Sequence, residues 1–399
     1  MFFQDLWEGI SLLTALLAGQ ILTPIDRIEE GAVCMEGGII AAVGSRADMT
    51  LPSAARVVDL GDVVLTPGLI DLHIHGAASH DVMEGDEAAF AAIESFIASH
   101  GVTSYCPTTV TAPVDRTLRS LEALRDRIER SDDRHSGQQR AQPLGVHCEG
   151  PFLSHARRGV HPPAQLQPAS VELFDRLWQA AGGRVCILTM APELEGAPAL
   201  IAEAAKRGVC VSLGHSDAHF NEASAGIDAG ARHATHTFNA MRPLRHRDPG
   251  LLGALLTDSR VTADIIVDGI HVDPVVIKIF VRTKGIDGVV LITDAISATG
   301  MPDGVYRLGE FEVTVQKGRC ESNGALAGSV LTLDRAVCNM ARFADLSFQS
   351  SLCMATLNPA RTLGLSGRKG SIQVGADADM TVFSRSGEVL KTIIGGVVA

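Results

Sequence analysis

The chain has 399 residues, of which 46% are hydrophobic and 20% are charged. This composition is typical of a globular protein with a large core and two domains. The net charge is −12 and the Lys and Arg residues form no dense cluster, which argues against a nucleic-acid partner. The eight cysteines include no Cys-x-x-Cys pair, and several lie in apolar runs, which indicates reduced thiols in the cytoplasm.

The first apolar segment covers residues 10–22. Asp5 and Glu8 precede it, so it lacks the positive start of a signal peptide, and it is too short to span a bilayer. We therefore expect a first β-strand here and no contact with a membrane.

The two ends of the chain share one pattern, in which short apolar runs are separated by Gly turns, over residues 12–62 and again over 370–399. Neither end is long enough for a comfortable β domain of its own. We expect them to pair into one small β-sandwich domain, made of residues 1–62 and 365–399, beside a catalytic domain of residues 63–364.

The middle of the chain alternates short apolar runs with amphipathic stretches. The apolar runs cover 63–76, 103–110, 143–149, 185–192, 209–215, 233–239, 261–271 and 289–295. Amphipathic stretches at 84–100, 114–130, 171–181 and 197–207 lie between several of them. Eight buried strands alternating with helices predict an α/β fold, a TIM-type (β/α)₈ barrel. After the eighth run we expect a hairpin over 306–319 and a helix over 332–343.

His73 and His75 end the first of these runs. Side chains alternate along a strand, so both imidazoles point the same way and can hold one metal ion. The alternative is that they are two unrelated histidines, one of them buried and hydrogen-bonded.

Further polar side chains stand at the ends of other runs. They are Glu149 after the third run, His215 after the fifth, His236 in the sixth and Asp294 in the eighth. Each alone has a plain explanation: a histidine at the rim, a carboxylate that accepts from a loop, or an Asp that caps a helix. Together they meet at the C-terminal mouth of a barrel, where active sites lie. Imidazole and carboxylate ligands suit Zn²⁺, Fe²⁺, Mn²⁺ or Co²⁺, as one or two ions.

The chain resembles the amidohydrolase superfamily and, within it, the N-acetylglucosamine-6-phosphate deacetylases. The residues that carry the resemblance are PGLIDLHIHG at 67–76, HCEGPFL at 147–153, GVH at 159–161, MAPE at 190–193, LGHS at 213–216, ATHTFNAM at 234–241, DGIHV at 268–272, TDA at 293–295 and LAGS at 326–329. The first motif is typical of the whole superfamily, whereas the third-strand, sixth-strand and LAGS motifs are more specific to the deacetylases.

The resemblance implies removal of acetate from the 2-acetamido group of N-acetylglucosamine 6-phosphate. It assigns metal binding to Glu149, His215 and His236, and it makes Asp294 the general base and acid. Some members lack the strand-one histidines and hold a single ion. Because His73 and His75 are both present here, a second ion bound by them with Glu149 and Asp294 stays open.

The resemblance also implies substrate contacts. His161 is expected to contact the sugar, and the side chain of Asn239 and the backbone of Ala240 the phosphate. Arg247 and His271 are expected to bind the phosphate, His271 from the neighbouring subunit of a homodimer. These roles agree with the need of a dianionic phosphate for basic groups.

Three alternatives to this substrate and activity can be compared with the sequence; the first stays open, and the residues present argue against the other two. Pro162-Pro163 and the basic segment 242–246 depart from the family pattern near the sugar, so N-acetylgalactosamine 6-phosphate is an alternative substrate. A hydantoinase-like or dihydroorotase-like enzyme would need a bridging lysine, and no lysine closes an apolar run. A non-enzymatic sugar-phosphate binder on an inactive barrel would be expected to have lost a metal ligand or the base.

Overall fold

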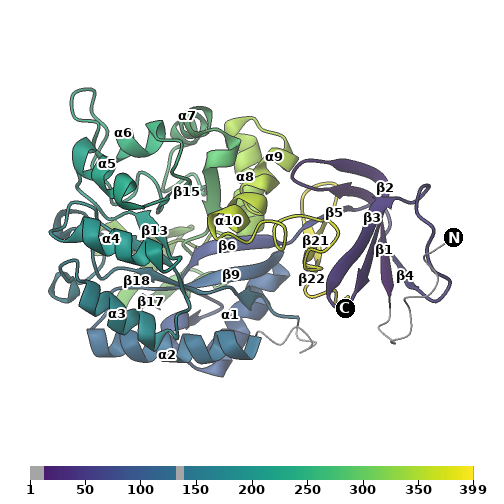
Figure 1. Cartoon of the computed structure of the whole chain (residues 1–399), viewed down its shortest axis with the longest axis horizontal. Helices are drawn as coiled ribbons and strands as arrows, with labels where there is room; N and C mark the ends of the chain where they lie inside the picture. Colours follow the sequence, from purple (N-terminus) through teal and green to yellow (C-terminus); the bar gives the residue numbers. More distant parts are fainter. Residues whose placement is uncertain (1–12, 132–138, 399) are drawn as a thin grey trace.

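The computed structural model describes residues 13–131 and 139–398. Figure 1 shows a large part in which helices surround a curled sheet, and a smaller part built from strands at both ends of the chain. Seven strands of the curled sheet are β6 (Leu69–Ile74), β9 (Val102–Thr109), β10 (Gln142–Pro143), β11 (Val146–Glu149), β12 (Val185–Met190), β13 (Cys210–Leu213) and β14 (His233–Ala234). All pairings within it are parallel.

A second parallel pair, β15 (Ala263–Ile266) with β16 (Val289–Ile292), completes the series of strands that follow the predicted runs. Main-chain hydrogen bonds join this pair to both sides of the curled sheet. Next to β14, the N–H of Thr237 donates to the main-chain oxygen of Asp264 on β15 (2.9 Å). After β16, the N–H of Asp294 donates to the main-chain oxygen of His73 on β6 (2.9 Å). The eight predicted runs thus each contain a strand, in an α/β fold.

Helices follow most of these strands and cover the outside of the curled sheet (Figure 1). They are α1 (Glu87–Ser99), α2 (Val114–Ser131), α3 (Val171–Ala180), α4 (Ala197–Lys206), α5 (Phe220–Ala229), α6 (Gly250–Thr257), α7 (Pro274–Lys284), α8 (Leu333–Ala344), α9 (Phe348–Cys353) and α10 (Leu357–Thr362). In α2, Leu121, Leu124 and Ile128 form the buried stripe at helical spacing that the sequence pattern predicts. The predicted helices at 84–100, 114–130, 171–181, 197–207 and 332–343 are confirmed.

The smaller part is one seven-stranded mixed sheet that contains both ends of the described chain. Its strands are β1 (Thr14–Leu22), β2 (Arg27–Glu36), β3 (Ile39–Ser45), β4 (Arg56–Asp59), β5 (Val64–Pro67), β21 (Met380–Phe383) and β22 (Val389–Ile393). Its own apolar cluster includes Leu16, Val33, Leu65 and Met380. β5 pairs with β1 on one side and with β21 on the other, so strands from both ends of the described chain share this sheet, together with β5 itself, which lies after the predicted boundary at residue 62.

The first predicted run, 63–76, is two strands rather than one. β5 pairs with β1 and β21, whereas β6 pairs with β9 in the curled sheet. The crossing occurs at Gly68, where a Cβ atom would lie 2.2 Å from Thr103 Oγ1. Only glycine permits so close an approach to β9, and this position lets the chain pass from one sheet to the other.

After β16 the chain forms an antiparallel sheet of β17 (Gly304–Leu308), β18 (Phe311–Gln316), β19 (Arg319–Ser322) and β20 (Ala325–Leu326). The hairpin predicted over 306–319 is confirmed by β17 and β18. A further short pair, β7 (Gly76–Ala77) and β8 (His80–Asp81), follows β6.

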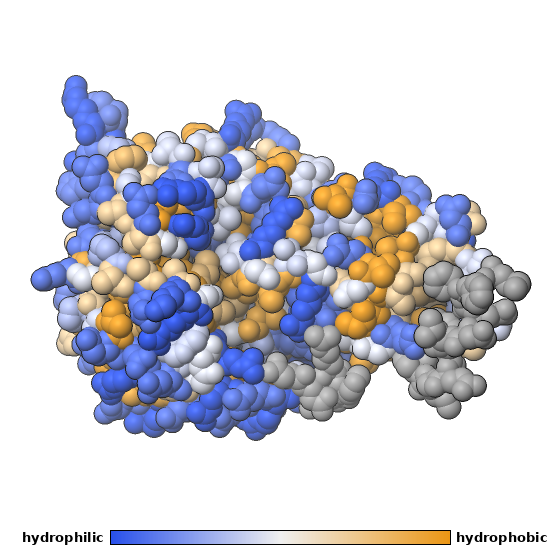
Figure 2. Space-filling model, in the orientation of Figure 1, coloured by the Kyte–Doolittle hydropathy of each residue, from blue (hydrophilic) through white to orange (hydrophobic). Residues whose placement is uncertain are grey.

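Polar side chains cover much of the face drawn in Figure 2, and hydrophobic ones are interspersed among them, several over β21 and β22. Among the described residues, no helix has the length and apolarity needed to cross a membrane. All eight cysteines are free thiols, five of them buried.

Candidate functional site

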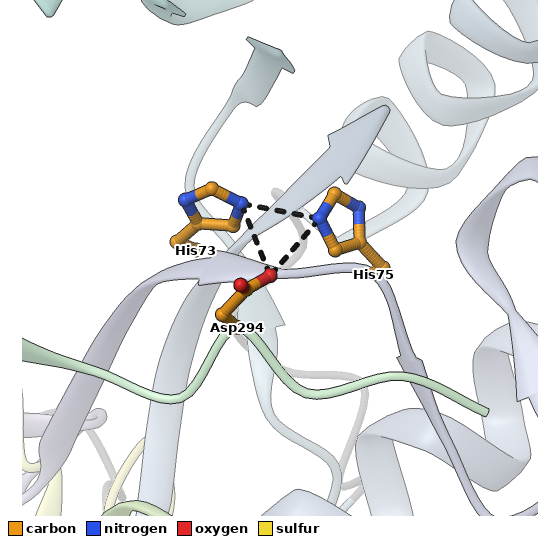
Figure 3. Close-up of side chains that lie close together, drawn as sticks. All are labelled: His73, His75 and Asp294. Carbon is orange, nitrogen blue, oxygen red and sulfur yellow. Dashed lines mark hydrogen bonds and ion pairs between the residues drawn. The ribbon is translucent and has the colours of Figure 1, made fainter. Parts of the chain in front are cut away.

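The strand ends bring the predicted polar side chains together. His73 and His75 lie on the same side at the end of β6, with their Nε2 atoms 3.1 Å apart. Asp294 enters from the segment after β16, and its Oδ1 lies 3.2 Å from His75 Nε2 and 3.5 Å from His73 Nε2. Figure 3 shows these three groups facing one another.

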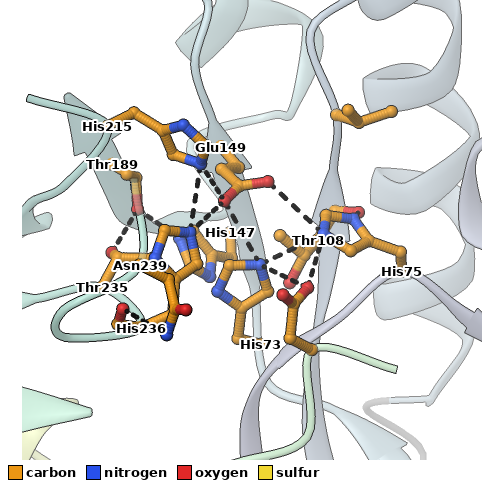
Figure 4. A network of polar contacts seen from close by, with 12 residues as sticks. His73, His75, Thr108, His147, Glu149, Thr189, His215, Thr235, His236 and Asn239 are labelled. Atoms are coloured by element: carbon orange, nitrogen blue, oxygen red, sulfur yellow. Dashed lines mark hydrogen bonds and ion pairs between the residues drawn. The ribbon is translucent and has the colours of Figure 1, made fainter. Parts of the chain in front are cut away.

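Glu149, the last residue of β11, connects this group to a second one (Figure 4). Its Oε1 lies 3.1 Å from His215 Nε2 and 3.0 Å from His236 Nε2. Its Oε2 lies 3.4 Å from His75 Nε2. The Glu149 side chain is 4% exposed. A single buried carboxylate is thus shared by imidazoles from three different strand ends.

Three of these positions have a left-handed backbone, with φ of +46° at His215, +30° at His236 and +51° at Asp294. Residues other than glycine avoid this region at a cost of about 1–2 kcal/mol, so surrounding structure must hold them there. The turn at His236 also explains why β14 has only two residues, although the apolar run continues to Asn239. The strands stop early because the chain turns to aim these side chains into the mouth.

Two of the imidazoles are oriented by their second nitrogen. His75 Nδ1–H donates to the main-chain oxygen of Thr108 (2.9 Å), and His215 Nδ1–H donates to that of Arg157 (2.9 Å). These bonds keep a proton on Nδ1 and direct Nε2 at the centre, the orientation found in metal-binding histidines. By contrast, Nδ1 of His73 and of His236 is buried with no hydrogen-bond partner among the described residues.

The electrostatics of the centre favour a cation. Burial by itself raises the pKa of Glu149, but the surrounding imidazoles, His73 foremost, hold it well below its usual value. Burial likewise opposes ionisation of Asp294, yet His73 and His75 lower the pKa of Asp294 to about 2. Both carboxylates are therefore ionised at neutral pH and can serve as metal ligand and proton acceptor.

The donor set also fits metal ions in size. The described residues contain two groups of three close ligand atoms, His73 with His75 and Asp294, and Glu149 with His215 and His236. In the second group the three atoms are 3.0–3.1 Å apart. A tetrahedral ion with ligands at about 2.0–2.1 Å needs edges of about 3.3 Å, so small outward shifts would admit one.

The centre opens into a cavity of about 280 Å³. Four of the five expected substrate residues line it: His161, Asn239, Ala240 and His271. His161 Nε2 lies 3.4 Å from Glu149 Oε2, and its Nδ1 lies 2.8 Å from the Thr111 hydroxyl.

His271 and Arg247, both expected to bind the phosphate, differ in their position relative to the cavity. His271 lines the cavity of its own chain, and its Nδ1–H donates to Asp268 Oδ2 (2.7 Å). Arg247 is exposed and is not among the residues that line the cavity.

The cavity has an apolar wall that the sequence interpretation did not assign to the site. It is formed by Leu308, Ala325, Leu326, Ala327 and Gly328. The LAGS motif at 326–329 was the available signal, but a motif of small apolar residues indicates no chemistry on its own. Ser329, the last residue of this motif, holds the backbone next to the Asp294 carboxylate. Its N–H donates to the main-chain oxygen of Asp294 (2.7 Å), and its hydroxyl donates to the main-chain oxygen of Thr293 (2.6 Å).

The chain is similar to known proteins over nearly its whole length. Residues 64–399 match the family model described as "Amidohydrolase family". N-acetylglucosamine-6-phosphate deacetylase of Bacillus subtilis is 36% identical over 381 residues, covering 95% of each chain. N-acetylgalactosamine-6-phosphate deacetylase of Escherichia coli O157:H7 is 34% identical over 385 residues, covering 96% of this chain and 98% of that one.

Solved structures agree with this similarity. A mutant N-acetyl-D-glucosamine-6-phosphate deacetylase from Mycobacterium smegmatis, in complex with N-acetyl-D-glucosamine-6-phosphate, superposes with a TM-score of 0.90 at 33% identity. The match covers 97% of this chain and all of that one. The deacetylase of Pasteurella multocida gives a TM-score of 0.90 at 30% identity and covers 97% of this chain and 99% of that one. The chain belongs to the amidohydrolase family.

Proposed function

We propose that the protein is a metal-dependent deacetylase that hydrolyses N-acetylglucosamine 6-phosphate to glucosamine 6-phosphate and acetate. The observation that carries this proposal is the position of Glu149, shared between two groups of metal-competent side chains beside an ionised Asp294. The 36% identity to a deacetylase of that name over 95% of the chain supports the choice of substrate.

Glu149, His215 and His236 would hold one divalent ion, Zn²⁺ or else Fe²⁺, Mn²⁺ or Co²⁺. His73, His75 and Asp294, with Glu149 as the bridge, would hold a second. When bound, such an ion supplies a water of lowered pKa and polarises the amide carbonyl. The four His and two carboxylates suit this role without any thiolate.

Asp294 moves the proton. Asp294 lines the cavity with its Oδ1 beside His75, and its ionised carboxylate would accept the proton of the attacking water. The protonated carboxyl then donates to the nitrogen of the amide as the C–N bond breaks, because an unprotonated amine is a poor leaving group. One residue therefore serves as base and then as acid in a single turnover.

The remaining side chains bind and orient the sugar. His161, beside Glu149 in the cavity, would contact the sugar, and Asn239 and Ala240, which also line the cavity, would contact the phosphate. Arg247 would supply positive charge, and His271 a ring nitrogen, for binding the phosphate. We further propose a homodimer. His271, which was expected to reach the neighbouring active site, lines the cavity of its own chain and would bind the phosphate there, and Arg247 would also take part in binding it.

N-acetylgalactosamine 6-phosphate is the second candidate substrate, because a deacetylase for that epimer is 34% identical over 96% of this chain. The two sugars differ only in the direction of one ring hydroxyl. Pro162-Pro163 and the basic segment 242–246 depart from the sequence expected of the gluco-specific deacetylases, which is compatible with this second substrate.

Acetate release from a panel of N-acetylated hexosamines tests the proposal. The panel contains the gluco and galacto epimers with and without the 6-phosphate, assayed before and after chelation and after re-addition of each divalent metal. We expect activity on the gluco 6-phosphate that is lost on chelation and restored by metal. A protein that binds the sugar phosphates but releases no acetate with any metal would instead be a binding protein on an inactive barrel.

We also propose a closed barrel, a small β domain and a cytoplasmic location for this protein. The curled sheet and the β15–β16 pair form one (β/α)₈ barrel within the predicted catalytic domain, which loses β5 (Val64–Pro67) to the terminal sheet. That seven-stranded sheet folds over its own apolar cluster as the small β-sandwich domain of the two chain ends. The hydrogen bonds that join β15 and β16 to both sides of the curled sheet support the barrel. The eight free thiols suit the cytoplasm.

A further inference from the structure

Among the described residues, none forms a hydrogen bond with the second ring nitrogen of His236 that would fix the orientation of its imidazole. Its Nε2 faces Glu149 and His215, but its Nδ1 is buried without a partner among the described residues. His75 and His215, by contrast, are each held through Nδ1 by a main-chain oxygen. The imidazole of His236 must therefore be aimed by its backbone, which has a φ of +30°.

Asp264 on the neighbouring strand β15 holds that backbone. Its Oδ1 accepts the main-chain N–H of His236, and its main-chain oxygen accepts the N–H of Thr237 (2.9 Å). The Asp264 residue is 0% exposed and does not line the cavity. It thus contacts the turn at two successive residues without access to substrate.

The second oxygen of Asp264 is fixed as well. Its Oδ2 lies 3.0 Å from Nε2 of His233, which is itself fully buried. The other ring nitrogen of His233 lies 2.7 Å from the Thr262 hydroxyl. The carboxylate is therefore locked from both sides, and a chain of contacts runs from Thr262 through His233 and Asp264 to His236.

We propose that Asp264 is a positioning residue that sets the metal affinity of the site by holding the main chain of His236 in its left-handed turn, with His233 fixing the carboxylate. A turn N–H cannot pair with the next strand as a strand N–H does, so Asp264 supplies the acceptor that the ladder lacks. This inference rests on the proposed function, because it assigns His236 to a metal ion.

The test measures the Zn²⁺ affinity of the metal-free protein by competition with a chelating indicator, together with its melting temperature. Asp264→Ala removes the carboxylate that accepts the His236 N–H and leaves the main-chain oxygen that accepts the Thr237 N–H. It is expected to weaken Zn²⁺ binding about 10- to 100-fold, the usual loss for a partner behind a metal ligand. Asp264→Asn keeps an oxygen for the His236 N–H and is expected to retain most of the affinity.

Glu94→Gln is the matched control, because Glu94 is equally buried but pairs with Arg127 away from the cavity. It should lower the melting temperature and leave Zn²⁺ affinity unchanged. His233→Phe keeps a ring but cannot donate to Asp264, and it should weaken Zn²⁺ binding in the same direction. This variant carries the test where Asp264→Ala does not fold.

Two outcomes separate the inference from the proposal beneath it. Wild-type affinity for Zn²⁺ in a folded Asp264→Ala or His233→Phe variant would overturn the positioning role alone. A wild-type protein that binds no divalent ion would overturn the proposed function and the positioning role with it.

Discussion

The proton transfer assigned to Asp294 can be tested by Asp294→Asn, which keeps the size of the side chain and removes its basicity. Asp294 is not a member of the Glu149, His215 and His236 group. The variant should therefore still bind an ion there, and lose affinity only at the group that contains His73 and His75. Removal of a general acid or base costs about 10²–10⁴ in rate, or about 3–5 kcal/mol in the barrier.

Turnover is measured as acetate release from N-acetylglucosamine 6-phosphate, and metal content is measured on the same preparations. Asp228→Asn is the matched control, because Asp228 is exposed, pairs with Arg260 and does not line the cavity. We expect kcat to fall by at least two orders of magnitude in Asp294→Asn and to stay unchanged in the control. Turnover within tenfold of wild type, with metal still bound, would refute the assignment of proton transfer to Asp294.

Three further predictions follow from single residues. Arg247→Ala should lower kcat/KM for the 6-phosphate substrate about 10- to 100-fold, the loss expected when a hydrogen bond to a charged group is removed. The rate on the unphosphorylated sugar should stay unchanged. Equal losses of kcat/KM on both sugars would speak against a phosphate contact. Gly328→Ala should lower the free energy of unfolding by at least about 1 kcal/mol, because φ is +61° and the new Cβ would lie 2.3 Å from Ile296 Cγ2. Denaturant titrations measure this change, and an unchanged midpoint of the unfolding transition would contradict the packing. Burial lowers the pKa of Lys284 to about 8, below its unfolded value of about 10.4, so the unfolded chain binds more protons between these two pH values. The free energy of unfolding should therefore rise with pH in that range, and Lys284→Met should flatten the rise. Parallel curves of unfolding free energy against pH for the two proteins would show that Lys284 does not cause it.

Much of the fold and half of the site geometry follow from local patterns. The apolar runs and the alternation of side chains along a strand place His73 and His75 on one face, and the structure has their Nε2 atoms 3.1 Å apart. The common direction of parallel strands likewise predicts that Glu149 and Asp294 meet them at one end of the sheet. These features depend only on residue type and period, which the sequence carries directly.

Other features depend on residues that are distant in sequence. The split of the first run at Gly68 is caused by the approach of β9, and the terminal sheet takes in β5 because β21 pairs with it from more than 300 residues away. No local pattern contains these contacts, because each requires the partner strand to be in place first.

The fine aim of the metal-competent side chains is likewise a tertiary property. His236 is easily found in its motif, but its left-handed turn and the Asp264 carboxylate that holds it arise only when β14 and β15 lie side by side. The sequence by itself determined which residue types end the strands, and hence the class of chemistry. The tertiary structure alone decided how they are held, because a strained turn persists only where packed neighbours supply the hydrogen bonds that it lacks.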